Sequence, residues 1–440
     1  MSARAWYQIK LDNDTKLSFT YLAKWIILAM LAGVIGTLVV HSFIYLLGLI
    51  RSLIAVSGVP IWVWPAAGAA LVGGIIYRIQ PHSAGEGIPS YIRGIRANQG
   101  KLEFSETFYT FWATLLTIAT FGNGGVVGPL GRVTSGVMSY IEGRINKLHI
   151  VFDKHDQRTA AICGLAAAIG TIFHSSIGAG IFAVEIIQRK SMGYRDLFPS
   201  ILSSASAVFV CKSIGWGSFY QFSAVDEFMD VRKIGWLLLL AILTGVAGSF
   251  YTYLYSRVSR LFKRKEGNVF LKVVAGSVLA FFIAWAVNPE LLGTSRNIIG
   301  ALFTNDISPV TGRLSSLPVV PVIIVIMFLK MLCNCLTVGS GMSAGFTGPT
   351  VIVGMLLGVA VSRISNVDCL SPTYYAYLAA GFAGMLASVM NVPLAAAVMA
   401  IEVFGLQYSF PAGFAAILGF QVTRHRTIYE YALEEFDIKD

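Results

Sequence analysis

Long apolar runs alternate with short charged segments along this chain. The runs Trp25–Leu49, Trp236–Leu254 and Val319–Leu336 each come close to the roughly 20 residues that an α-helix needs to cross a bilayer. Other runs, such as Ile61–Ile76 and Tyr375–Met390, are shorter and interrupted by Gly or Pro. Short apolar helices are typical of tilted, re-entrant or buried segments. The pattern predicts an all-α polytopic membrane protein whose helices differ in length.

Composition supports this prediction and excludes other classes. Only 13% of the 440 residues are charged, against about 25% in a soluble domain. The net charge of +10 is concentrated between apolar runs, which is typical of cytoplasmic loops rather than of nucleic-acid binding. Cysteines and histidines show no metal-ligand spacing, and no nucleophile–base pair or phosphate loop is present. We therefore expect no metal, no cofactor and no enzyme activity. The polar first 20 residues also predict no cleavable signal peptide.

The chain contains an internal repeat with a constant offset. Gly122–Gly131 and Gly339–Gly348 share the pattern G-x-G-x-x-x-G-x-x-G. Gly164–Glu185 and Gly381–Glu402 both begin with Gly and end with Glu after a small-residue helix. The differences 339 − 122 and 402 − 185 both equal 217. One offset across two separate blocks indicates a duplicated unit.

The duplication sets the expected domain boundaries. We expect a cytoplasmic segment 1–20, a first membrane repeat 21–212, a linker 213–234, a second repeat 235–430 and a cytoplasmic tail 431–440. Duplicated membrane bundles often pack as inverted repeats with a binding site between them near the midplane of the bilayer. The spacing alone leaves inverted and parallel arrangements open.

Three glycine-rich breaks interrupt the apolar runs, at Gly85–Pro89, Gly122–Gly131 and Gly339–Pro349. Irregular backbone within a membrane must be buried in protein or line a wet cavity. Each break precedes a predicted helix, and a helix N-terminus carries free N–H groups and about half a positive charge. Several such ends meeting at one point would hold an anion weakly enough to release it. The alternative is that these glycines only permit tight turns and close helix contacts. We expect the helices to begin near Tyr91, Val133 and Val351.

These breaks resemble the CLC family of chloride channels and transporters, in which the motifs G-S-G-I-P, G-R-E-G-P and G-x-F-x-P direct helix N-termini at the chloride path. The first motif is present here as Gly85–Pro89 (GEGIP), and the third as Gly345–Pro349 (GFTGP), with its Phe one position early. Asn391–Glu402 (NVPLAAAVMAIE) matches the signature of the second half. Arg426–Tyr429 resembles the segment that carries a Tyr ligand. The resemblance extends from about Leu22 to Tyr429.

The resemblance implies a CLC-type fold: inverted halves of short, tilted and broken helices. It also implies a homodimer with one pore per subunit, a plasma (inner) membrane location, cytoplasmic termini, and no CBS domains. The expected partners are chloride or a similar small anion and the lipid bilayer. The residues expected to line the anion path are Gly85, Glu86, Gly87, Ile88, Pro89, Gly128, Leu130, Gly131, Gly345, Phe346, Thr347, Gly348 and Tyr429.

Departures from the family pattern bear on mechanism. Leu130 falls where the family has its gating glutamate, and Ile186 falls where exchangers have an internal proton glutamate. Neither side chain can take up a proton, so passive, channel-like or uncoupled anion transport is the leading interpretation. Alternatives are a proton-coupled antiporter that uses Glu86 and a membrane scaffold or sensor that no longer conducts. A fluoride-handling relative fits poorly, since we would expect Met at position 86 and a retained gating Glu.

Glu86 replaces the motif Ser that faces the central anion. It could pair with Arg93 or Arg132, or act as a tethered anion that fills the site, or mark a changed function. Since a buried carboxylate is protonated more readily than an exposed one, the tethered form predicts a gate opened by acid. Arg132 is either a snorkelling residue at the interface or a counter-ion to Glu86 or to the anion.

Two further features leave alternatives. Glu185 and Glu402 end equivalent apolar helices, which favours a shared structural role, capping or pairing, over a transport role. Tyr429 is interpreted as a ligand, with an interfacial aromatic as the alternative.

Overall fold

The computed structural model describes residues 3–145, 155–187, 194–219, 227–264, 268–304, 306–424 and 426–430, with side chains from Tyr21 onward. The expected tail 431–440 and part of the expected linker, 220–226, lie outside the described residues. The side chains of the expected segment 1–20 also lie outside the described residues. The backbone of this segment, from Ala3 onward, forms the beginning of the first helix.

The described residues are mainly helical. The first half contains α1 (Ala3–Val56), α2 (Val63–Gly74), α3 (Ile88–Ala97), α4 (Phe104–Ala119), α5 (Val127–Ile145), α6 (Asp156–Phe173), α7 (Gly178–Glu185) and α8 (Tyr194–Ser213). The second half contains α9 (Ile234–Arg264), α10 (Val269–Val287), α11 (Arg296–Leu302), α12 (Ser308–Thr311), α13 (Val319–Gly339), α14 (Thr347–Ile364), α15 (Pro372–Met390), α16 (Pro393–Phe404) and α17 (Ser409–Thr423). Short 3-10 or π turns lie at Ile75–Ile79, Pro81–Ser83, Val231–Lys233, Pro289–Leu291, Gly312–Leu314 and Leu406–Tyr408.

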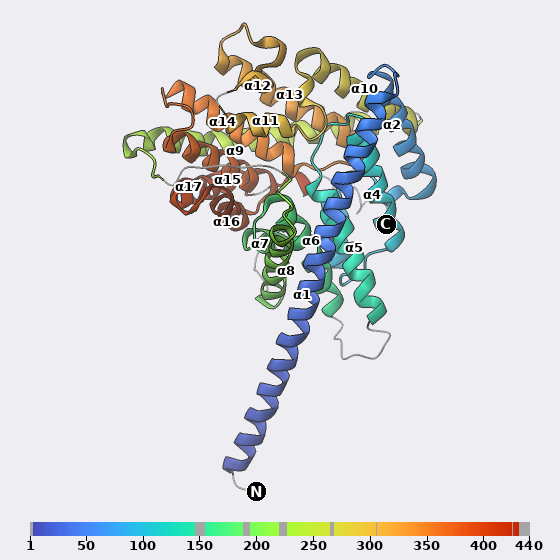
Figure 1. Ribbon diagram of the computed structural model, residues 1–440, viewed down its shortest axis with the longest axis vertical. Coiled ribbons are helices and arrows are strands. Elements are labelled where there is room, and N and C mark those ends of the chain that lie inside the picture. Colours follow the sequence, from blue (N-terminus) through green and yellow to red (C-terminus); the bar gives the residue numbers. More distant parts are fainter. Residues whose placement is uncertain are drawn as a thin grey trace.

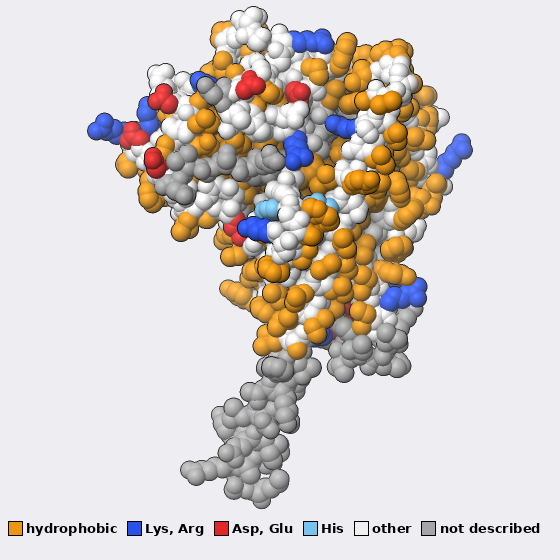
Figure 2. Space-filling model, in the orientation of Figure 1, with side chains coloured by type: hydrophobic (Ala, Val, Ile, Leu, Met, Phe, Trp, Pro, Cys, Tyr) orange, Lys and Arg blue, Asp and Glu red, His pale blue; other side chains and the backbone are white. Residues whose placement is uncertain are grey.

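The outer surface is apolar along its flanks, as lipid contact requires. Among the described residues, five helical segments are long and apolar enough to cross a membrane, and they lie in α1, α9, α10, α13 and α14. In Figure 1, α1 runs along one flank of the bundle from its lower to its upper end. Large apolar side chains on this helix, including Ile27, Tyr45 and Leu53, are exposed. Hydrophobic side chains cover this flank in Figure 2, so the protein is an integral membrane protein that crosses the bilayer several times.

The two halves are inverted with respect to each other. Adding 217 to the residue numbers of α5, α6, α7 and α8 gives approximately the residue numbers of α14, α15, α16 and α17, so these helices are equivalent in the repeat. Glu185 at the end of α7 accepts N–H bonds from Leu394 and Ala395 at the start of α16. Glu402 near the end of α16 accepts N–H bonds from Ile177 and Gly178 at the start of α7. Equivalent helices therefore run in opposite directions, which resolves the choice that the sequence left open.

Glycines let the central helices approach closely. An added Cβ at Gly354 on α14 would lie 2.1 Å from the carbonyl oxygen of Gly381 on α15, and one at Gly381 would lie 2.0 Å from that of Gly354. In the first half, a Cβ at Gly164 on α6 would lie 2.6 Å from the carbonyl oxygen of Thr134 on α5. Such backbone contact is typical of helix packing in membranes.

The helices after the glycine breaks begin earlier than we predicted. They start at Ile88, Val127 and Thr347, instead of near Tyr91, Val133 and Val351. The prediction placed each start at the first apolar run, whereas the first helical turn lies within the Gly-Pro motif itself. A Pro fits there because the first N–H groups of a helix have no partner within the helix. The N–H groups at these helix ends therefore belong to the motifs.

Candidate anion site

Glu86 lies where three helix N-termini meet. Its side chain is buried, and its neighbours Gly85 and Gly87 have φ angles of 84° and 91°, which favour glycine. One carboxylate oxygen, Oε2, accepts a bond from the N–H of Ile88, in the first turn of α3, at 3.1 Å. The other, Oε1, lies 3.4 Å from the N–H of Phe346, the residue before α14. The carboxylate thus accepts N–H groups from both halves of the protein.

The start of α5 forms the third side of this site. A Cβ added at Gly128 would lie 2.3 Å from Oε1 of Glu86, so the carboxylate packs directly on the α5 backbone. A Cβ at Gly87 would lie 3.0 Å from the carbonyl oxygen of Gly128, so α3 and α5 also approach at glycines. Only residues without a side chain fit this junction.

Tyr429 completes the contacts of the carboxylate. Its hydroxyl donates to Oε1 of Glu86 at 3.4 Å, and the ring is buried. The Thr347 hydroxyl, at the first residue of α14, lies close to the Tyr429 hydroxyl. Position 429 is therefore in the protein interior and not at a membrane surface.

The two duplicated glycine turns touch each other. Gly125 and Gly345 exchange backbone hydrogen bonds of 2.8 and 2.6 Å, which form an isolated antiparallel bridge. A Cβ at Gly124 would lie 2.4 Å from the Cβ of Ala344. The structure therefore brings together the motif glycines that we expected to meet, and it fixes α5 and α14 relative to each other.

Leu130 and Ile186, the two apolar residues expected to bear on mechanism, are both buried. Leu130 is fully buried in the first turn of α5. Ile186 follows the last residue of α7 and lines a pocket together with Glu185, Asn391 and Tyr429. Tyr429 thus connects this pocket to the Glu86 carboxylate.

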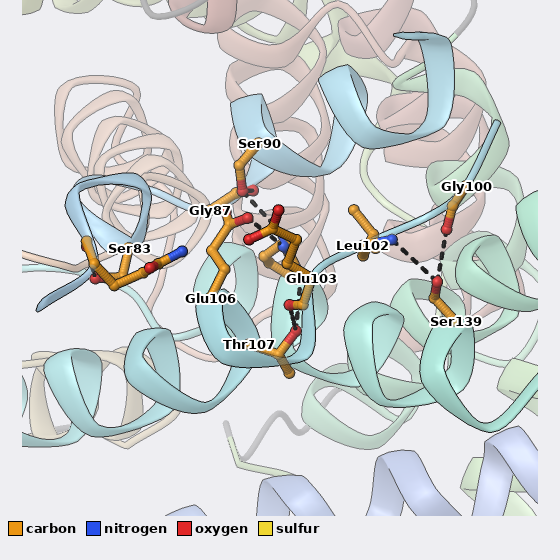
Figure 3. A network of polar contacts seen from close by, with 11 residues as sticks. Ser83, Gly87, Ser90, Gly100, Leu102, Glu103, Glu106, Thr107 and Ser139 are labelled. Atoms are coloured by element: carbon orange, nitrogen blue, oxygen red, sulfur yellow. Dashed lines mark hydrogen bonds and ion pairs between the residues drawn. The ribbon is translucent and has the colours of Figure 1, made fainter. Parts of the chain in front are cut away.

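Arg132 does not pair with Glu86. Its guanidinium is fully buried and lies 2.8 Å from the carboxylate of Glu106 on α4. It also donates to the hydroxyls of Ser90 on α3 at 3.0 Å and Thr107 on α4 at 3.1 Å, and Figure 3 shows both residues near Glu106. Burial excludes the snorkelling interpretation, and the partner Glu106 was not predicted. Among the described residues, the Glu86 carboxylate contacts neither Arg93 nor Arg132.

Glu185 and Glu402 act as helix caps, the structural role that we favoured. Each carboxylate accepts N–H groups from the start of the other's helix, and Glu402 also accepts the hydroxyl of Ser175. A carboxylate at a helix N-terminus is favoured by the free N–H groups and by the helix dipole.

Sequence reasoning missed a buried polar cluster behind the glycine turns. Lys330 on α13 bonds to Asn123, and Asn334, one turn further along, bonds to the carbonyl oxygens of Asn123 and Gly345. The signal was present, since Lys330 interrupts the apolar run Val319–Leu336. A charged residue in such a run indicates function by default.

Comparisons with known proteins agree with this architecture. The sequence profile of the voltage gated chloride channel family matches residues 68–424. An uncharacterized protein of Methanocaldococcus jannaschii is 25% identical over 418 residues, covering 93% of this chain and 96% of that protein. The chloride/fluoride channel protein of Pseudomonas syringae pv. tomato is 24% identical over 425 residues, covering 93% and 86%. The crystal structure of a CLC-type fluoride/proton antiporter matches with a TM-score of 0.79 at 18% identity, covering 93% of this chain and 98% of that one.

Proposed function

Because the chain belongs to the voltage gated chloride channel (CLC) family, we propose that it conducts chloride or a similar small anion passively, with Glu86 as a tethered anion that closes the path. One observation carries the proposal. The carboxylate of Glu86 accepts the Ile88 N–H and the Phe346 N–H, which lie at helix ends, and the Tyr429 O–H, and the same donors would also hold a halide. A halide and the carboxylate cannot use the same donors together.

Protonation of Glu86 would open the path. A neutral carboxyl group no longer competes for anion-binding donors, and burial away from water disfavours its charged form. Exchangers of the family carry proton-binding glutamates at the positions of Leu130 and Ile186, and neither of these side chains can bind a proton. This supports passive transport over coupled transport. Tyr429 and the pocket beside it would form one entrance to the site.

The remaining expectations are part of the same proposal. We propose a homodimer in the plasma membrane with one path per subunit and both termini in the cytoplasm. The basic residues Arg257 and Arg260 near the end of α9 support a cytoplasmic end for that helix.

Anion flux from proteoliposomes at several pH values, with proton movement recorded alongside, tests this function. The wild-type protein is expected to pass chloride faster in acid and to move no protons against their gradient. Glu86→Gln should raise flux by roughly tenfold in alkaline solution, where the carboxylate is charged, which corresponds to removing a competitor that fills the site about 90% of the time. The same substitution should abolish the pH dependence.

Glu142→Gln provides a matched control. Glu142 is another buried carboxyl group, on the later turns of α5, and within the described part of the chain neither of its oxygens has a hydrogen-bond partner. This variant should keep the wild-type pH dependence. An unchanged flux and pH dependence in Glu86→Gln would contradict the tethered-anion gate. Stoichiometric proton movement against its own gradient would instead indicate an antiporter, and a complete lack of flux would indicate a scaffold or sensor.

A further inference from the structure

Lys330 is a fully buried cation behind the anion site. Its ammonium lies 2.6 Å from the Ser295 hydroxyl and 2.8 Å from the side-chain oxygen of Asn123. It also lies 3.1 Å and 3.3 Å from the carbonyl oxygens of Leu291 and Gly293. These oxygens come from the first glycine turn and from the segment between α10 and α11. Among the described residues, no Asp or Glu pairs with Lys330.

The hydrogen-bond partners of Lys330 suit a charged ammonium. The side-chain NH₂ group of Asn123 donates to the carbonyl oxygen of Leu291, which turns its oxygen toward Lys330. The Ser295 hydroxyl donates to the same carbonyl, so a lone pair faces Lys330. All four neighbours are thus acceptors, which suits an ammonium with three protons and no lone pair. A neutral amine would direct its lone pair at one of these oxygens.

The charge lies directly behind both glycine turns. Asn123 precedes Gly124 in the first turn. The amide of Asn334 donates to the carbonyl oxygens of Asn123 at 3.1 Å and Gly345 at 3.3 Å, and so connects the two turns. The side-chain oxygen of Asn334 accepts the hydroxyl of Tyr251, whose ring packs edge-on against Phe346. Phe346 in turn supplies an N–H to the anion site.

We propose that Lys330 is the fixed positive charge of the anion site and positions both of its glycine turns. The inference deepens the proposed anion transport and rests on it. Because the interior screens charge weakly, a buried ammonium attracts an anion that it does not touch. Its protons are engaged by protein oxygens, so Lys330 raises anion affinity without trapping the anion in an ion pair. The helix ends contribute only partial charges to the same attraction.

Asn123→Asp separates charge from hydrogen bonding. Aspartate keeps the oxygen that faces Lys330 and adds a negative charge next to it, with almost no change in shape. Aspartate also loses the N–H that Asn123 donates to the carbonyl oxygen of Leu291, so the thermal unfolding midpoint is measured alongside. A purely structural lysine predicts weaker bromide binding only if the variant is also less stable. The proposal instead expects bromide to bind on the order of tenfold more weakly, because the ammonium is now neutralised.

The measurement is bromide titration by calorimetry on the purified full-length protein in the Glu86→Gln background, where the tether is removed. Asn288→Asp is the control, since Asn288 is also buried but makes its contacts with other groups than Lys330. It should bind bromide like the parent. Equal affinities in Asn123→Asp and the parent would overturn the inference.

Lys330→Met and Lys330→Arg give a second test if Asn123→Asp does not fold. The arginine variant keeps the charge and should bind bromide more tightly than the methionine variant. If folded Lys330→Arg bound bromide as weakly as Lys330→Met, the role of the charge would be overturned. A parent that neither binds bromide nor passes chloride would instead overturn the proposed function itself, so the two failures are distinguishable.

Discussion

The ion pair between Arg132 and Glu106 shows how one residue supports the site without touching the anion. Arg132 donates to the Ser90 hydroxyl, and that hydroxyl donates to the carbonyl oxygen of Gly87 at 3.0 Å. Gly87 is the residue before α3, whose first N–H contacts Glu86. The guanidinium is fully buried, and the Glu106 side chain is only 12% exposed. The pair therefore connects α4 and α5 to the beginning of α3.

Removing one member of this pair should destabilise the protein. Arg132→Leu leaves a buried carboxylate without its counter-charge, which we expect to cost about 3–5 kcal/mol of unfolding free energy. Replacing both members, in Arg132→Leu with Glu106→Leu, should recover most of that loss because no buried charge remains unpaired. Denaturant unfolding of the purified protein, followed by tryptophan fluorescence, measures both changes. A double variant as unstable as the single one would show that the pair contributes shape and hydrogen bonds rather than charge compensation.

The sequence predicted which residues form the site better than it predicted which residues contact each other there. The sequence placed Glu86, Phe346 and Tyr429 in one site because the motifs themselves carry those positions. It could not show that Arg132 pairs with Glu106, since that contact depends on the rotation of α5 against α4. Neither helix has a pattern that specifies this rotation.

At the scale of helices, the glycine motifs were located correctly but the helix starts were placed too late. A hydrophobic run indicates which turns of a helix contact lipid or the protein core. The first residue of the helix is instead set by the backbone conformation, which such a run does not show. At Gly87 the positive φ angle and the following Pro89 set that point, before any apolar run is visible. The Ile88 N–H group that contacts Glu86 lies in this interval.

The reciprocal caps on α7 and α16 should differ in strength. Glu402 accepts the N–H groups of Ser176, Ile177 and Gly178 at 3.0, 2.8 and 2.9 Å, together with the Ser175 hydroxyl. Glu185 accepts two N–H groups at the start of α16, counted over the residues that the structure describes.

We expect Glu402→Ala to lower the unfolding free energy by about 2 kcal/mol and Glu185→Ala by about 1 kcal/mol, in line with typical cap values. Paired denaturant titrations of the two variants measure this. Glu402→Gln, which keeps part of the hydrogen bonding, should lie between wild type and Glu402→Ala. A larger loss in Glu185→Ala than in Glu402→Ala would contradict the ranking.

For the whole molecule, the sequence predicted the duplication but not the buried polar contacts that join distant parts of the chain. A constant offset of 217 residues identified equivalent helices. The spacing left their relative directions open, the family resemblance implied inversion, and the contacts between α7 and α16 confirm it. The cluster around Lys330 joins residues 207 positions apart, such as Lys330 and Asn123. No local pattern encodes a contact of that range, so only the lysine itself could have been noted.

The anion site joins the two halves, so occupancy should stabilise the whole bundle. Donors to the site come from Ile88 in the first half and from Phe346 and Tyr429 in the second. In wild-type protein in alkaline solution, the charged Glu86 carboxylate already makes these contacts, and added bromide should change the thermal unfolding midpoint little. In Glu86→Gln the donors are available to the halide.

Bromide at 100 times its dissociation constant should then stabilise the Gln variant by about 2.7 kcal/mol, if it binds only the folded state. Thermal unfolding in detergent, with and without bromide, measures the difference. Gluconate at the same concentration serves as the control, because that anion is too large for a site bounded by glycine backbone. An equal rise in wild type and Glu86→Gln would mean that bromide binds elsewhere, and that the carboxylate of Glu86 does not occupy the halide position.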